Sequence, residues 1–238
     1  MSVCSLGRIR ALINARNIDY IRTLLWFPGL DIGWYPCHDV EYPDEYFEKF
    51  EYYKTTQMGK HINDFRVSFV NSIYSGDVVD VGIGAGYFIE QRGEQVRTYG
   101  YDVSEYGKRW LTKRDLEIDP YNEDVYAITC WDSLEHIRDC WTLVQCAQRF
   151  VFTSIPIVRS AEDAMKSKHF KPHEHYWYMT HEGLIRCFNL LGFELIDSSV
   201  CEMEYGREEI GTYAFERLSG VPVQRYVMDQ DGVRRVDK

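Results

Sequence analysis

The stretch "DVVDVGIGAGYF", residues 77–88, carries the strongest structural signal in this 238-residue chain. Its first half favours a short buried strand, and three glycines follow at Gly82, Gly84 and Gly86. Glycines let a backbone turn tightly and let a ligand approach it closely. A loop between a first strand and a helix also directs backbone N–H groups and the helix N-terminus toward the ligand. The sequence therefore predicts a ligand-binding loop here.

Two acidic residues narrow the choice of ligand. Dinucleotides favour the spacing G-x-G-x-x-G, whereas these glycines follow G-x-G-x-G and are preceded by Asp80. Asp80 would repel a pyrophosphate but suits S-adenosylmethionine, which carries a sulfonium, an ammonium group and no phosphate. Asp102 in "YGYDVS" comes 22 residues later, near the offset of about 20 residues typical of an acid that binds ribose hydroxyls. Taken singly, each glycine would indicate only a tight turn, but the combination predicts an adenosyl ligand.

Short β-rich runs alternate with helical ones from Val78 onward, which is typical of a parallel α/β sheet. We expect a Rossmann-like, mostly parallel sheet flanked by helices, with an antiparallel C-terminal hairpin strand. The stretch between Asp102 and Val125 is short, so the third strand is expected to be abbreviated or missing. The predicted divisions are an N-terminal helical, aromatic extension or lid at 1–63, an S-adenosylmethionine-binding domain at 64–220 and a polar tail at 221–238.

Local patterns predict further elements. Helices are expected over 12–27, within 46–73, over 86–94, 104–112 and 139–148, and after a cap at Thr180. A long loop is expected over 158–178, and a turn is expected to join the last two strands. The aromatic stretch 34–53 either packs on the sheet or forms a lid that excludes water from the reaction.

The bulk composition points to a soluble, cytosolic protein. Net charge is −10 and the sequence pI is near 5.2, which argues against a protein that tracks DNA phosphates. Seven cysteines without a C-x-x-C pair are most simply reduced thiols. No signal peptide is predicted, and no apolar run approaches the roughly 20 residues needed to span a membrane.

The chain resembles the class I S-adenosylmethionine-dependent methyltransferases over roughly residues 64–218. The resemblance rests on "VVDVGIGAGYF", "YGYDVS", "VYAITCWDSLEHIRD", "FVFTSIPI" and "HEHYWYMTHEGLIRCFNLLGFELI". It is nearest to the small-molecule branch that includes ubiquinone-biosynthesis-like enzymes. It implies that Asp102 binds the ribose hydroxyls and that Val103 lies beside the adenine. Trp131 and Asp132 would flank the methionine and the methyl group. The positions expected to border the methionine part are Asp80, Gly82, Gly84 and Gly86.

Two further cofactor contacts follow from the same resemblance. A tyrosine and an arginine upstream of the glycine loop often reach the cofactor's carboxylate in this branch, and Tyr53 and Arg66 are the candidates here. The acid that contacts the adenine amino group stays open between Asp115, Glu117 and Asp119.

Candidate catalytic residues are His136, His175 and Asp132, because an oxygen acceptor usually needs a base and histidine suits proton transfer near neutral pH. The alternative for His136 is a packing role at a helix start. His173 and His175 would share one side of an extended segment, a spacing that a metal ion can use. No further ligand stands at a diagnostic spacing, so no metal site is predicted.

The leading hypothesis is a methyltransferase that acts on an O or N atom of a small molecule or glycan-like metabolite. The alternatives are a non-catalytic binding protein of the same fold, acting through its N-terminal helices, and a nicotinamide-dependent oxidoreductase, which the glycine spacing disfavours. The sequence lacks the [DNS]-P-P-[YFW] motif of DNA amino-methyltransferases after its fourth strand, where it reads "CWDS", so DNA is not an expected partner. A homodimer is kept as a candidate assembly.

Overall fold

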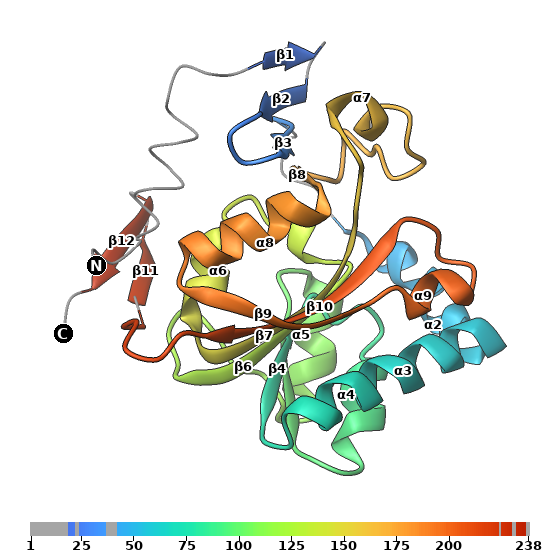
Figure 1. Cartoon of the computed structure of the whole chain (residues 1–238). Coiled ribbons are helices and arrows are strands. Elements are labelled where there is room, and N and C mark those ends of the chain that lie inside the picture. The colour runs from blue at the N-terminus through green and yellow to red at the C-terminus, as the bar shows by residue number, and fades with distance from the viewer. Residues whose placement is uncertain (1–18, 22–23, 37–41, 224, 230–231, 237–238) are drawn as a thin grey trace.

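A six-stranded sheet forms the centre of the computed structural model, which describes residues 19–21, 24–36, 42–223, 225–229 and 232–236 (Figure 1). The strand order is β5-β4-β6-β7-β10-β9. The strands are β4 (Val78–Val81), β5 (Thr98–Tyr101), β6 (Val125–Trp131), β7 (Ala147–Pro156), β9 (Phe193–Ser199) and β10 (Ile210–Arg217). Strand β10 is antiparallel to both β7 and β9, whereas β4, β5, β6 and β7 pair in parallel. This confirms the predicted Rossmann-like sheet with an antiparallel C-terminal strand.

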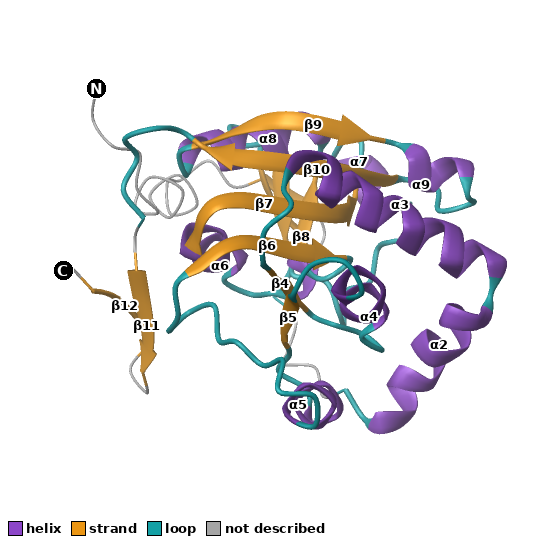
Figure 2. Cartoon of the chain, turned by 90° about the horizontal axis from the view of Figure 1, so that it is seen from below, coloured by secondary structure: helices purple, strands orange, loops and turns teal. Residues whose placement is uncertain are grey.

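Helices cover both faces of this sheet (Figures 1 and 2). One face carries α3 (Gln57–Ile73) and α4 (Tyr87–Gly93), and the other carries α6 (Cys140–Cys146) and α8 (His181–Leu190). The remaining helical segments are α2 (Asp44–Thr55), α5 (Glu105–Thr112), the 3-10 helix η1 (Leu134–His136), α7 (Ala161–Ala164) and α9 (Cys201–Glu204). The cap predicted at Thr180 is confirmed, because its side chain accepts a hydrogen bond from the Gly183 amide at the start of α8.

The third strand is reduced to a single bridge at the edge of the sheet. Gly100 of β5 pairs in parallel with Glu117, and its N–H donates to the Leu116 carbonyl at 2.9 Å. The abbreviated third strand predicted from the short stretch after Asp102 is therefore confirmed.

A second, smaller sheet joins the N-terminal part of the chain to the segment before α8. Its order is β1-β2-β3-β8, with β1 (Asp19–Ile21), β2 (Leu24–Phe27), β3 (Ile32–Trp34) and β8 (Trp177–Met179). The helix predicted over 12–27 is therefore wrong for its described part, because residues 19–21 and 24–27 form β1 and β2, which pair with each other, and β2 also pairs with β3. Residues 158–178 are likewise not one loop, since they contain α7 and the start of β8. The remaining residues of the helix predicted over 12–27, which are 12–18 and 22–23, lie outside the described part of the chain.

The main core fills the space between the sheet and helices α6 and α8. Trp141, Leu184 and Phe188 from these helices are buried against Ile128 and Val151 of the central strands. A second cluster lies on the other face, where Val67 and Val70 of α3 pack with strand residues. The aromatic stretch of α2 is partly structural as well. Its Phe47 is buried and its ring stacks on Tyr106 of α5 at 4.3 Å between centroids.

Two corrections concern the C-terminal third of the chain. The connection between β9 and β10 is not a simple turn, because α9 lies within it. The tail beyond residue 220 contains β11 (Arg225–Asp229) and β12 (Gly232–Val236), which pair as an antiparallel hairpin.

The described cysteines, which are Cys130, Cys140, Cys146, Cys187 and Cys201, form no disulfide. Within the described residues, no helix combines the length and apolar character that a membrane span requires.

Candidate active site

The glycine loop lies between β4 and α4, and all three glycines adopt left-handed backbone conformations. Their φ angles are +77° at Gly82, +54° at Gly84 and +70° at Gly86. A Cβ atom at Gly82 would lie 2.7 Å from the Ser133 Cβ, and one at Gly86 would lie 2.3 Å from the Trp110 ring. At Gly84 the nearest atoms would be those of the Phe50 ring, in ordinary contact at 3.7 Å. Gly82 and Gly86 therefore allow close packing of the protein, whereas Gly84 has partly exposed backbone with room for a Cβ atom.

Asp102 holds this loop against the neighbouring strand. Its carboxylate accepts hydrogen bonds from the Ile83 amide at 3.0 Å and from the Ser104 amide at 2.8 Å. Burial raises the pKa of Asp102, while these hydrogen bonds act in the opposite direction. Each carboxylate oxygen still has accepting capacity, which suits a pair of ribose hydroxyls. Val103 beside it is 66% exposed, so its side chain is available to a planar ring.

Asp80 is buried inside the sheet beneath the loop. It is 2% exposed and accepts a hydrogen bond from the Thr129 hydroxyl at 2.7 Å. Burial raises the pKa of Asp80 to about 7, against the opposing effects of the Thr129 hydrogen bond and the Arg66 charge. A cationic ligand nearby would favour its ionised form.

Asp80 should make the stability of the fold depend on pH. Folding raises the pKa of Asp80. The stability that its protonated carboxyl contributes is therefore fully present below about pH 4 and is lost as pH rises through about 7. Asp80→Asn keeps an acceptor for Thr129 but cannot ionise. Since each pKa unit is worth about 1.4 kcal/mol, the variant should gain a few kcal/mol relative to wild type between these limits. Urea unfolding at both pH values measures this, and a pH-independent difference would contradict it.

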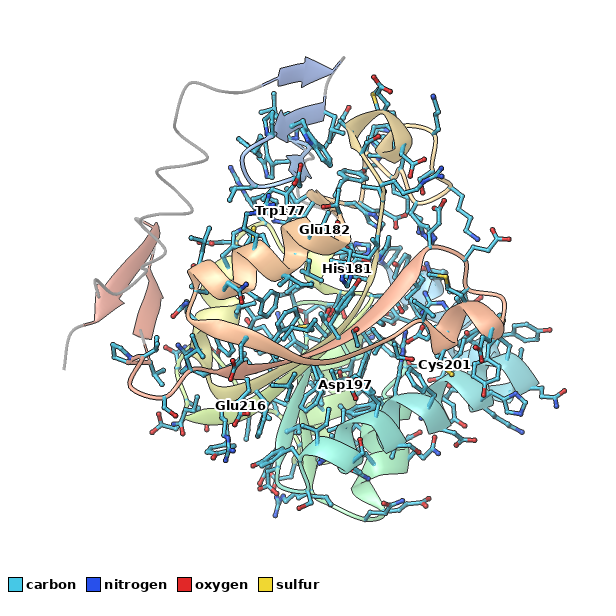
Figure 3. All side chains as sticks on the ribbon, viewed as in Figure 1. Trp177, His181, Glu182, Asp197, Cys201 and Glu216 are labelled. Atoms are coloured by element: carbon cyan, nitrogen blue, oxygen red, sulfur yellow. The ribbon has the colours of Figure 1, made fainter. Side chains whose placement is uncertain are left out.

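A buried ion-pair network closes the carboxyl end of β6. Arg66 of α3 donates to Asp132 at 2.7 Å, to Ser154 at 2.8 Å and to both oxygens of Glu202 at 2.8 and 2.9 Å. Arg207 donates to both oxygens of Asp132 at 2.8 Å and to Glu202 at 2.6 Å. Glu202 comes from α9, whose first residue is labelled at the right of Figure 3. Two arginines and two carboxylates thus balance in charge.

The network determines the protonation state of Asp132. Burial alone would raise its pKa, but the guanidinium groups of Arg207 and Arg66 outweigh that effect and hold the pKa well below its ordinary range. Asp132 also has a φ of +54°, an unusual value for a residue other than glycine. Its carboxylate is therefore a weak base, better suited to electrostatic positioning than to proton transfer.

Two buried donors beside this network lack partners. The Tyr53 hydroxyl and the Trp131 indole N–H have no hydrogen-bond partner within the described part of the chain. The Arg66 guanidinium lies 5.1 Å from the centroid of the Trp131 ring. Tyr53 lies near Arg207 and Arg66, whose charges oppose the rise in its pKa that burial causes. Because buried polar groups are normally hydrogen-bonded, these donors fit an acceptor group such as the carboxylate of a bound amino acid.

His136 and His175 lie side by side just beyond β6. Their ring centroids are 4.5 Å apart, and the Tyr42 hydroxyl lies 3.3 Å from Nδ1 of His136. Burial lowers the pKa of His136 to about 4 and, together with His136, lowers that of His175 to about 2. Both imidazoles are therefore neutral at physiological pH.

The expected pairing of His173 with His175 is wrong. The segment is a turn rather than an extended strand, since the amides of Glu174 and His175 both donate to the Lys171 carbonyl. His173 is consequently exposed while His175 is buried. A turn of this kind directs the two side chains apart.

Several site residues escaped the sequence reasoning. Arg207 and Glu202 lie in the connection between β9 and β10, where no local pattern marks them. Ser154 lies near the end of β7, where no local pattern marks it either. Glu135 stands next to His136 in "LEHI" and is 2% exposed, so an acid directly before a candidate histidine was the available signal.

Comparisons with known proteins agree with this geometry. A family model described as a methyltransferase domain matches residues 50–198. A magnesium protoporphyrin IX methyltransferase from Synechocystis PCC 6803, with bound SAH, is 14% identical with a TM-score of 0.51, covering 73% of this chain and 95% of that one. An S-adenosylmethionine-dependent methyltransferase from Clostridium acetobutylicum ATCC 824 is 13% identical with the same TM-score, covering 73% and 99%. At these identities the likeness shows the fold. The search of curated proteins gives no match.

Proposed function

The chain belongs to the methyltransferase-domain family, whose members use S-adenosylmethionine, and from this we propose that it methylates an O or N atom of a small molecule or glycan-like metabolite. The observation that carries the proposal is the pairing of the partly exposed backbone at Gly84 with the carboxylate of Asp102. Both groups lie at the carboxyl ends of adjacent parallel strands, where open α/β sheets bind their ligands.

We propose that the cofactor spans the region from Asp102 to the ion-pair network. Its ribose would contact Asp102, with the adenine against Val103. Its amino-acid end would pass over the glycine loop toward Tyr53 and Arg66. The partnerless hydroxyl of Tyr53 supports this placement. Arg66 already donates to the carboxylates of Asp132 and Glu202, so the Tyr53 hydroxyl would be a further donor to the carboxylate of the cofactor.

The acceptor would approach from the side of His136 and His175. Efficient proton transfer calls for a base whose pKa lies near the working pH, and these imidazoles have pKa values of about 4 and 2. We therefore assign them to positioning the acceptor, together with Asp132, rather than to a strong base. Methyl transfer itself needs chiefly proximity and alignment, because the sulfonium is already a good electrophile.

A labelled-methyl assay tests the acceptor class. Purified protein with S-adenosylmethionine carrying an isotopic methyl group is offered small hydroxylated compounds, small amines, sugars and duplex DNA, with and without added divalent cations. Label should enter a small-molecule or sugar acceptor and not DNA, because the chain has a net charge of −10. Label found in DNA alone would contradict the proposal. An exposed-site variant, His173→Ala, serves as the matched control and should retain wild-type activity.

A further inference from the structure

We propose that Glu135, His136 and His175 form a binding site for a divalent first-row transition metal ion. Each side chain offers one ligand atom, and these atoms all lie within 4.8 Å of one another. Metal–ligand bonds of about 2.0–2.2 Å place neighbouring ligand atoms roughly 3–3.6 Å apart, so binding needs the side chains to move inward by about an ångström. Two imidazoles and one carboxylate form a donor set typical of such ions at sites with open coordination positions.

The carboxylate of Glu135 supplies an independent reason to expect a ligand. It is 2% exposed, and its Oε2 atom has no hydrogen-bond partner within the described residues. A buried carboxylate oxygen without a partner is costly, and a metal cation would supply the interaction that this oxygen lacks.

The His136 imidazole is also arranged as a metal ligand usually is. A metal-bound histidine generally engages its second ring nitrogen with another polar group, which fixes the ring. The Tyr42 hydroxyl lies 3.3 Å from Nδ1 of His136, which leaves Nε2 for the metal. His136 is only partly buried, so the site has access to solvent.

Backbone hydrogen bonds hold the two contributing segments together. The Tyr176 amide, directly after His175, donates to the Glu135 carbonyl at 2.9 Å. One residue farther on, the Trp177 indole donates to the Ile137 carbonyl at 3.1 Å. Because Tyr176 also accepts a bond from the small sheet through the Tyr35 amide, the fold fixes these ligands before any ion arrives.

The ion's role in catalysis, unlike its binding, rests on the proposed function. An acceptor hydroxyl bound at an open coordination position would become more acidic and release its proton to solvent. The oxygen lone pair would then form a bond to the methyl carbon as the carbon–sulfur bond breaks. That electron pair would return to sulfur, leaving S-adenosylhomocysteine. Such an ion would supply the activation that the weakly basic His136 and His175 do not.

Cobalt binding tests the site directly. Untagged protein, freed of metal by a chelator, is titrated with Co²⁺ alone and followed by calorimetry and by visible d–d absorption. Wild type should bind one ion per chain, and Glu135→Gln and His175→Ala should each weaken binding at least tenfold, in line with the 10- to 100-fold losses seen even for outer-shell changes. His173→Ala, which removes an exposed histidine two residues away, should bind as wild type does.

Other results would overturn the site. No saturable Co²⁺ binding, or an equal loss in His173→Ala, would refute it. Should a cluster variant fail to fold, the wild-type spectrum decides, because bands with the same position and intensity as those of the aqueous ion would contradict nitrogen coordination. Titrating the metal-free protein with S-adenosylmethionine separates the two proposals, since cofactor binding without Co²⁺ binding refutes only the metal site.

Discussion

Replacing Gly84 by valine should lower the affinity for S-adenosylmethionine at least 100-fold while leaving the fold intact. A β-branched residue is a genuine outlier at the +54° φ of this position, and holding it there costs about 1–3 kcal/mol of strain. Its side chain would also occupy the open face that the ligand is proposed to approach. A Cβ here would make only an ordinary contact with the Phe50 ring at 3.7 Å, so the fold has room for a Cβ atom at this position. Calorimetry measures the affinity.

Gly93→Val is the matched control for this loop. Gly93 is the last residue of α4, and a Cβ there would meet nothing within 4 Å. Its backbone lies outside the left-handed region that the loop glycines adopt. The control should bind S-adenosylmethionine as wild type does. Near-equal affinities of the two variants would contradict the assignment of Gly84 to the cofactor loop.

Glu202→Gln should lower the free energy of unfolding by about 3–5 kcal/mol, the usual cost of removing one partner from a buried ion pair. Glu202 is fully buried and bonds both Arg66 and Arg207. A glutamine has the same shape, but its amide would present N–H groups to guanidinium donors. One uncompensated positive charge would also remain in the cluster. Urea unfolding at neutral pH, with the slope of the transition compared between variants, measures the loss.

Glu216→Gln provides the surface control for this change. Glu216 pairs with Arg149 at 2.6 Å, but the Arg149 side chain is 49% exposed. Figure 3 labels Glu216 near the end of β10, far from α9. Exposed pairs contribute about 0–1 kcal/mol, so this control should change stability little. If the two variants lost equal stability, the network beside β6 would not be a buried structural element.

The parts of the fold that the sequence predicted are those with local signals. Glycine spacing, strand alternation and the Thr180 cap act over a few residues, and all three lie where they were expected. The Asp80 and Asp102 positions followed from them, because adjacent parallel strands bring such residues to one edge of the sheet. The strand formed by residues 24–27 was missed because it pairs with β3, and β3 in turn pairs with residues 177–179, about 150 positions away from residues 24–27.

The chemistry of the site was less accessible for the same physical reason. Arg66, Asp132 and Glu202 come from three elements, and only packing brings their charges together. The protonation states of Asp80 and His136 depend on burial, which a linear pattern does not report. Sequence reasoning could therefore nominate His136 and His175 but could not show that His175 lies beside His136 and its neighbour Glu135.

The measurement that tests the central claim most directly is a calorimetric titration of the purified chain with S-adenosylmethionine and, separately, with NADH. We expect saturable, one-to-one binding of S-adenosylmethionine and none of NADH. Asp102→Ala should weaken the first without unfolding the chain, because Asp102 is proposed to bind the ribose. Binding of NADH alone, or of neither ligand by the folded protein, would contradict the assignment of the glycine loop to S-adenosylmethionine.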